Sequence, residues 1–156
     1  MFPSKRIVCP TDFSEASLQA LANATEIALH NQAEIYLVHV IPVSLTTADR
    51  CMPITMPEYQ RFLKPQQRLE QIAESLRAKG LQTVLVTGRG DPATEIVRIA
   101  KEKGADVIVI ATHGNTGWRH FAFGSVAEKV VRLASCPVLS IRAAAGAGAT
   151  AAAPEK

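Results

Sequence analysis

The chain has 156 residues, of which 47% are hydrophobic and 20% are charged. This length suits one domain with a sizeable core, and this composition excludes disordered, collagen-like and coiled-coil proteins. The 17 Lys and Arg residues exceed the 14 Asp and Glu residues by three, and they are scattered along the chain, so we expect no nucleic-acid surface.

No apolar run approaches the roughly 20 residues that a membrane-spanning helix needs, and the start of the sequence lacks the long apolar stretch of a secretory signal. We therefore expect a cytoplasmic protein with no membrane partner. The cysteines Cys9, Cys51 and Cys136 are odd in number and have no CxxC spacing, which excludes a disulfide framework or zinc knuckle by pattern. We expect Cys9 and Cys136 to be buried.

The first third of the chain predicts a strand, a helix and a second strand. Residues 7–9 and 35–41 are apolar runs without clean alternation, which is typical of strands covered on both faces. Between them, Leu18, Leu21 and Ala28 follow helical spacing. His39 falls inside the second run and is expected to be a satisfied histidine of the core or of a pocket edge, because no second ligand lies at metal spacing.

A long connection and an ambiguous helix follow. Residues 42–57 have mixed composition and predict a mobile surface excursion that could cover a ligand. Pro65 lacks an amide hydrogen, so the stretch from 58 to 79 predicts either a kinked helix or one that begins near Lys64. Gly80 is expected to end it, and residues 83–86 predict the third strand.

The last part of the chain predicts two further helices and two strands. Asp91 and Pro92 mark the start of the third helix, and Gly104 follows its end. Residues 107–111 and 138–141 predict the last two strands, and the helix between them carries Val126, Val130 and Leu133 at helical spacing. The tail from 143 to 156 is almost only Ala and Gly and is expected to be disordered.

This alternation predicts an α/β fold with an open, doubly wound, five-stranded parallel sheet, strand order 3-2-1-4-5 and helices on both faces. In such sheets a ligand lies outside the carboxyl ends of the strands where the winding reverses, here between the first and fourth strands. That rule directs attention to residues 10–12 and 111–114.

Two motifs near these strand ends have both a functional and a structural interpretation. Glycines and a helix amino terminus in residues 111–128 can hold phosphate, but Ser125 and Glu128 also fit a capping box that binds nothing. Asp12 can contact a ligand, or it can cap the first helix with Glu15 as its box partner. Spacing alone leaves both pairs of interpretations open.

Taken together, the motifs resemble the universal stress protein family of bacteria and archaea over residues 6–142. The resemblance implies a family domain at 1–142 with the fold of the adenine nucleotide alpha hydrolases, followed by the tail at 143–156. The motifs that carry it are residues 7–14, the strand end at 37–40, residues 88–92, the turn at 112–114, Gly124-Ser125 and residues 136–139.

The nucleotide-binding branch of that family carries the pattern G-x2-G-x9-G-S/T. Its second glycine falls on Gly114 and its last pair on Gly124 and Ser125, whereas its first glycine falls on Ala111. The resemblance implies ATP binding, with Mg²⁺ attached through the phosphates, and the Ala111 methyl adds one carbon where backbone would lie near the ribose. The implied contacts are Pro10, Thr11 and Asp12 with the adenosine, the Val40 backbone with the adenine, Ala111 with the sugar, and His113, Gly114, Gly124, Ser125 and Val126 with the phosphates.

The sequence contains no Ser/His/Asp order, paired carboxylates, Walker lysine or metal cluster, which favours a binding module over an enzyme. We expect an ATP-binding cytoplasmic module of the stress response, in which nucleotide occupancy biases assembly or a partner contact. One alternative is slow ATP hydrolysis or autophosphorylation, with Ser125 or Thr112 as acceptor and His113 assisting. Another, which Ala111 favours, is a dimeric stress protein that binds no nucleotide.

The family resemblance also implies a homodimer formed through the last strand, at Val138, Leu139 and Ile141. The outer edge of that strand would otherwise stay unpaired, and an exposed apolar edge favours pairing with another chain.

Overall fold

The computed structural model describes residues 4–42, 56–112 and 124–142, and of these it describes the side chains of all but residues 56–63. Most of the 42–57 connection and the whole 143–156 tail lie outside the described residues. The described elements, in chain order, are β1 (Arg6–Pro10), α1 (Glu15–Asn31), β2 (Glu34–Ile41), α2 (Met56–Arg77), β3 (Thr83–Arg89), α3 (Pro92–Lys103), β4 (Val107–Ala111), α4 (Ser125–Leu133) and β5 (Val138–Ile141).

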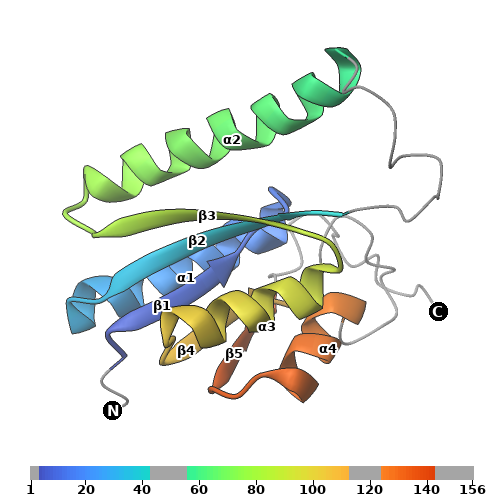
Figure 1. Cartoon of the computed structure of the whole chain (residues 1–156). Helices are drawn as coiled ribbons and strands as arrows, with labels where there is room; N and C mark the ends of the chain where they lie inside the picture. The colour runs from blue at the N-terminus through green and yellow to red at the C-terminus, as the bar shows by residue number, and fades with distance from the viewer. Residues whose placement is uncertain (1–3, 43–55, 113–123, 143–156) are drawn as a thin grey trace, which may run out of the picture.

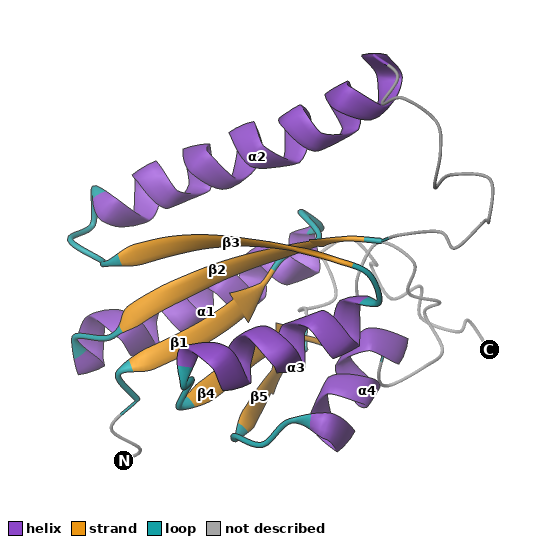
Figure 2. Cartoon of the chain, viewed as in Figure 1, coloured by secondary structure: helices purple, strands orange, loops and turns teal. Residues whose placement is uncertain are grey.

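All five strands run parallel in one sheet with the order β3-β2-β1-β4-β5 (Figures 1 and 2). The predicted order 3-2-1-4-5 is therefore confirmed. Ile7 of the central strand pairs with Ile35 of β2 on one side and with Val107 of β4 on the other. Because the strands are parallel, their carboxyl ends lie at one edge of the sheet, where β1 and β4 are neighbours.

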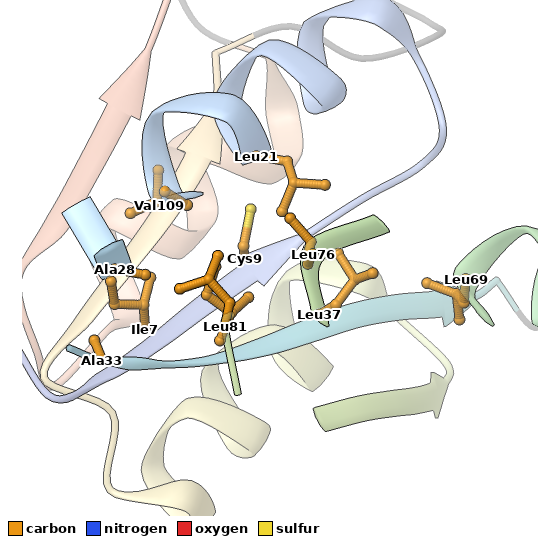
Figure 3. Packing of buried hydrophobic residues seen from close by; sticks show 12 residues of the cluster. Ile7, Cys9, Leu21, Ala28, Ala33, Leu37, Leu69, Leu76, Leu81 and Val109 are labelled. Carbon is orange, nitrogen blue, oxygen red and sulfur yellow. The ribbon is translucent and has the colours of Figure 1, made fainter. Parts of the chain in front are cut away.

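Successive residues of β1 enter two separate hydrophobic cores. Ile7 and Cys9 pack with residues of α1 and α2 (Figure 3), whereas Val8 packs with residues of α3 and α4. All three side chains are fully buried. Burial of one such aliphatic side chain contributes about 1.5–3 kcal/mol, which explains why this strand is apolar at successive positions from Ile7 onward rather than at alternate ones.

The ends of α1 and α3 follow from side-chain caps. Asp91 accepts a hydrogen bond from the amide of Thr94 at 2.9 Å, Pro92 is the first helical residue, and Gly104 ends α3 with φ of 60°, all as predicted. The cap of α1 differs from the prediction, because Ser14 and not Asp12 accepts from the Ser17 amide. The capping interpretation of Asp12 is therefore wrong.

Helix α2 agrees with the predicted alternative of a helix that runs through Pro65, whereas strand β3 is longer than predicted. The helix runs from Met56 through Pro65 to Arg77, so a start near Lys64 is wrong. Gly80 follows it with φ of 83°, a conformation that favours glycine. Strand β3 continues three residues beyond 86, because its pairing with β2 extends to the pair Ile41 and Arg89.

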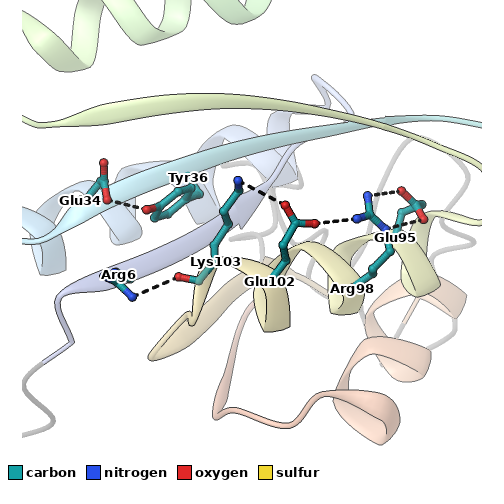
Figure 4. A network of polar contacts seen from close by, with 7 residues as sticks. All are labelled: Arg6, Glu34, Tyr36, Glu95, Arg98, Glu102 and Lys103. Atoms are coloured by element: carbon teal, nitrogen blue, oxygen red, sulfur yellow. Dashed lines mark hydrogen bonds and ion pairs between the residues drawn. The ribbon is translucent and has the colours of Figure 1, made fainter.

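The amino ends of the strands are joined by polar contacts at the edge opposite the predicted site. Asp106 accepts hydrogen bonds from the main-chain amides of Lys5 at 2.7 Å and Arg6 at 2.8 Å, which ties the start of β1 to the start of β4. The Tyr36 hydroxyl donates to Glu34 at 2.6 Å, and this bond raises the pKa of Tyr36 (Figure 4). This edge stabilises the sheet and leaves the carboxyl edge for a ligand.

Candidate functional site

Thr11 is the fixed point at the carboxyl end of β1. Its amide donates to the carbonyl of Val38 at 2.8 Å, its hydroxyl lies 3.0 Å from the Ser17 hydroxyl, and the same hydroxyl accepts from the Phe13 amide at 3.0 Å. Pro10 and Thr11 are buried, whereas Asp12 is exposed. The turn therefore places the Asp12 carboxylate at the sheet edge on a rigidly held backbone.

His39 of the neighbouring strand β2 forms a hydrogen bond with this turn. Its Nδ1 lies 2.8 Å from the carbonyl oxygen of Thr11. Because a carbonyl only accepts, Nδ1 carries the proton in this hydrogen bond. His39 is half-buried, which agrees with the expected pocket-edge histidine, and the described residues contain no group of three metal-ligating side chains.

Strand β4 and helix α4 meet at the same edge. The Thr112 amide donates to the carbonyl of Ile141 at 2.9 Å, and the Gly124 amide donates to the carbonyl of Thr112. Ala111 and Thr112 are buried, with 8% and 4% of their surfaces exposed. The burial of Thr112 argues against its hydroxyl as an accessible phosphate acceptor, whereas Ser125 is exposed.

Helix α4 begins without a side-chain cap. Gly124 is the N-cap residue, with extended backbone at φ of −72° and ψ of 151°, and Ser125 is the first helical residue. The capping-box interpretation of Ser125 and Glu128 is therefore wrong, because Ser125 lies one position inside the helix. Amides in the first turn of a helix have no helical acceptor and carry the positive end of its dipole, so they are donors suited to phosphate.

An ion pair between Lys129 of α4 and Asp91, the N-cap residue of α3, joins these two helices. Lys129 Nζ lies 2.9 Å from Asp91 Oδ2, the same oxygen that accepts from Thr94. The hydrogen bond from the Thr94 hydroxyl and then the Lys129 ammonium lower the pKa of Asp91 to about 2. Helix α4 is thus held at its start by the hydrogen bond from Gly124 to Thr112, and farther along by the ion pair from Lys129 to Asp91.

The two described cysteines do not supply a nucleophile. Cys9 is fully buried, and burial raises the pKa of its thiol to about 12. Cys136 was also expected to be buried but is only half-buried against the core, and desolvation raises the pKa of this thiol as well. Both thiols stay protonated near neutral pH, whereas reactive cysteines are thiolates.

The structure brings most of the predicted site residues to one edge of the sheet. Val40 lies near the end of β2, with its side chain in the core formed with α3 and α4. His113 and Gly114 lie outside the described residues. The remaining predicted residues lie at the carboxyl ends of β1 and β4 or at the start of α4: Pro10, Thr11, Asp12, Ala111, Gly124, Ser125 and Val126.

Sequence reasoning missed three residues that shape this edge. Ser14 and Ser17 complete the turn after β1, and Phe13 adopts a positive φ of 64° there. The three cap-forming residues Thr11, Asp12 and Ser14 were a signal for a tight turn, but they did not indicate which side chain forms the cap. No pattern in the sequence indicated the conformation of Phe13.

Among the described helices, none combines the length and the apolar character needed to cross a membrane. The model of the universal stress protein family matches residues 3–142. The curated universal stress protein MJ0531 of Methanocaldococcus jannaschii is 37% identical over 145 residues, which are 88% of this chain and 82% of that protein.

Solved structures share the fold. That of MJ0577 from Methanocaldococcus jannaschii is 29% identical, has a TM-score of 0.74, and covers 90% of this chain and 96% of its own. That of a universal stress protein from Archaeoglobus fulgidus in complex with dAMP is 24% identical, has a TM-score of 0.64, and covers 90% of this chain and 98% of its own.

Proposed function

The chain belongs to the universal stress protein family, and on this premise we propose that it binds ATP at the carboxyl edge of the sheet, with Mg²⁺ attached through the phosphates. Nucleotide occupancy biases self-assembly or contact with a protein partner, and the protein acts as a cytoplasmic regulatory module of the stress response. Such a bias requires that the nucleotide bind two states with different affinities.

The observation that carries this proposal is the hydrogen bond from the Gly124 amide to the Thr112 carbonyl. It brings the uncapped start of α4 to the end of β4, next to the end of β1. The amides of Ser125 and Val126 then supply donors for phosphate oxygens. Ser125 is exposed, so its hydroxyl is also available to a ligand.

The other half of the site suits a nucleoside. The exposed Asp12 carboxylate accepts hydrogen bonds, as the sugar hydroxyls of a nucleotide require. Val40 and Ala111 offer backbone and a small side chain beside it. The Archaeoglobus fulgidus structure in complex with dAMP supports the choice of ligand class, because it places an adenine nucleotide on this fold.

The first test is the nucleotide content of the protein. The chain is purified without added ligand and denatured, and the released small molecules are identified by ion-pair chromatography; the emptied protein is then titrated with ATP and Mg²⁺ by calorimetry. We expect release of ATP or ADP, or saturable binding of ATP with one site per chain. An emptied protein that ignores millimolar ATP contradicts the proposal and favours a stress protein that acts without nucleotide.

A variant at the first helical residue tests where the phosphates lie. Ser125→Pro removes one amide donor, yet proline suits the first helical position, as Pro92 shows in α3, and the extended Gly124 is compatible with a following proline. We expect this variant to bind ATP about tenfold more weakly than the parent and to bind adenosine with unchanged affinity. Ser125→Ala, which keeps the amide, is the matched control and should weaken ATP less.

The exposed edge of β5 supports a further proposal, that the protein forms a homodimer through this strand. Leu139 is 40% exposed, and Val138 and Ile141 are half-buried on the same strand. β5 is an outer strand of the sheet, so one of its edges has no partner strand in the described fold. A second copy of the chain would cover both the apolar side chain and the edge.

A further inference from the structure

Phe13 has a backbone conformation that is unfavourable for a bulky residue. Its φ of 64° lies in the left-handed region, where a Cβ atom crowds the following carbonyl. Gln32 has a comparable φ, but it is the C-cap residue of α1, where this conformation is common. At Phe13, contacts elsewhere in the fold must hold the backbone in place.

The ring of Phe13 lies between groups from two other elements. Its centroid is 4.6 Å from that of the His39 ring in β2, with 37° between the ring planes. The guanidinium carbon of Arg68 in α2 lies 4.6 Å from the same centroid, which is cation–π geometry. Phe13 is half-buried and Arg68 is exposed, so the cation covers the ring from the solvent side.

Both rings of this stack belong to residues that form hydrogen bonds with Thr11 of the candidate site. His39 donates from Nδ1 to the Thr11 carbonyl, while the Phe13 amide donates to the Thr11 hydroxyl. Asp12 lies between Thr11 and Phe13 in the sequence, and its Oδ1 accepts a hydrogen bond from the Ser14 amide at 3.0 Å. The Asp12 carboxylate and the Phe13 ring therefore belong to one hydrogen-bonded turn.

Helix α2 also lines a cavity at the carboxyl ends of β2 and β3. This cavity of about 320 Å³ lies between the helix and the strand ends, lined by Ile41, Pro65, Gln66, Leu69, Thr87 and Arg89. Figure 1 shows α2 rising away from the sheet toward its amino end. Arg68 precedes Leu69, one of these lining residues, and from this part of α2 it contacts the Phe13 ring.

We propose that Phe13 is a positioning residue for the adenosine end of the site and that Arg68 holds its ring from α2. This inference rests on the proposed nucleotide site and adds to it the residues that set the Asp12 turn. Neither side chain is required to touch the ligand. The phosphate end, at Gly124 and Ser125, lies on other elements and does not depend on this stack.

The test separates the two ends of the site in the full-length chain. Affinities for ATP and for inorganic tripolyphosphate are measured by calorimetry in Phe13→Asn, Phe13→Tyr and Arg68→Met. Asparagine tolerates a positive φ, so Phe13→Asn removes the ring while permitting the backbone conformation. Arg77→Met is the matched control, because Arg77 belongs to the same helix but contacts Glu70 and the Thr83 carbonyl, at the amino end of β3.

We expect Phe13→Asn to lower the affinity for ATP about tenfold and Arg68→Met to lower it about threefold. The affinity of Phe13→Tyr for ATP should stay within about twofold of the parent. The affinity for tripolyphosphate should stay unchanged in all of these variants. Arg77→Met should change the affinity for neither ligand. Loss of both ligands in parallel, or unchanged ATP affinity in Phe13→Asn, overturns the inference.

A second readout does not depend on nucleotide. The imidazole Nδ1 proton of His39 is followed by NMR, and its exchange with water should accelerate in Phe13→Asn and in Arg68→Met but not in Arg77→Met. If the parent protein binds no nucleotide, the proposed function fails, and this exchange rate still decides whether the stack holds the turn. Unchanged exchange in Phe13→Asn shows that it does not.

Discussion

Lys129 Nζ lies 2.9 Å from Asp91 Oδ2, so the carboxylate that caps α3 also holds α4. Both side chains are well exposed, and exposed ion pairs contribute little to stability. We expect Lys129→Met to lower Tm by about 2 °C or less, and Asp91→Ala, which also loses the cap, to lower it further. Thermal unfolding followed by circular dichroism measures both, and an equal loss in the two variants means that the cap contributes nothing.

Asp91 also predicts a dependence of stability on pH. Its pKa is lowered to about 2 in the folded protein, from an ordinary value of 3.8. A carboxyl with a lowered folded pKa stabilises the fold above its unfolded pKa, and this contribution is lost as the pH falls toward the folded value. Between about pH 4 and about pH 2, the parent should therefore lose more stability than Asp91→Asn.

The measurement is the urea midpoint of both proteins across that pH range. Asparagine still accepts at an N-cap position but does not titrate, so it isolates the charge. If the difference between the two midpoints stays constant as the pH falls, Asp91 does not have a lowered pKa in the folded protein.

Ala111 tests the departure from the glycine pattern. It is the last residue of β4, 8% exposed and paired with Ile141. Ala111→Gly should cost about 1 kcal/mol of stability, because glycine loses more backbone entropy on folding. Removal of the methyl should leave ATP affinity equal or higher by calorimetry, and weaker binding would show that the methyl contributes a contact.

The central strand tests the two-sided core. Ile7 is fully buried, so Ile7→Val should cost about 1 kcal/mol in the free energy of unfolding. The control is Val131→Ala on α4, where the valine is well exposed, and this variant should stay within about 0.5 kcal/mol of the parent. Urea denaturation measures both, and a similar cost in the two variants contradicts the assignment of the core.

The edge of β5 predicts the oligomeric state. Analytical ultracentrifugation of the parent should show a dimer, and Leu139→Lys should shift the mass toward the monomer while the circular dichroism spectrum stays native. Leu133→Lys on α4, where the leucine is also well exposed, is the control and should remain dimeric. A monomeric parent rules out the proposed homodimer.

Much of the fold was predictable from local signals. Continuous apolar runs between helical segments indicated parallel strands covered on both faces, and right-handed crossovers left one natural order for them. Asp91, Pro92 and Gly104 marked the ends of α3 because each has a backbone requirement of its own. Pro65 left two interpretations of α2 open, because proline is disfavoured inside a helix, and the structure decides between them since the helix continues through Pro65.

The site was predictable to the level of which strand ends meet, but not to the level of hydrogen bonds. Thr11, Asp12 and Ser14 are all good cap formers, but only Ser14 forms the cap, while the Thr11 hydroxyl contacts Ser17 and the Asp12 carboxylate accepts from Ser14. The positive φ of Phe13 opposes its intrinsic preference. Such a conformation depends on tertiary contacts, which a sequence pattern does not contain.

The order of the strands has a consequence for synthesis on the ribosome. β1 emerges first and lies at the centre of the sheet, but its second neighbour, β4, begins only at Val107. Until then a nascent chain can form only the β3-β2-β1 part of the sheet, so one edge of the central strand stays open during most of translation. Such an edge invites pairing with other chains, and the half-made protein is therefore a natural client for chaperones.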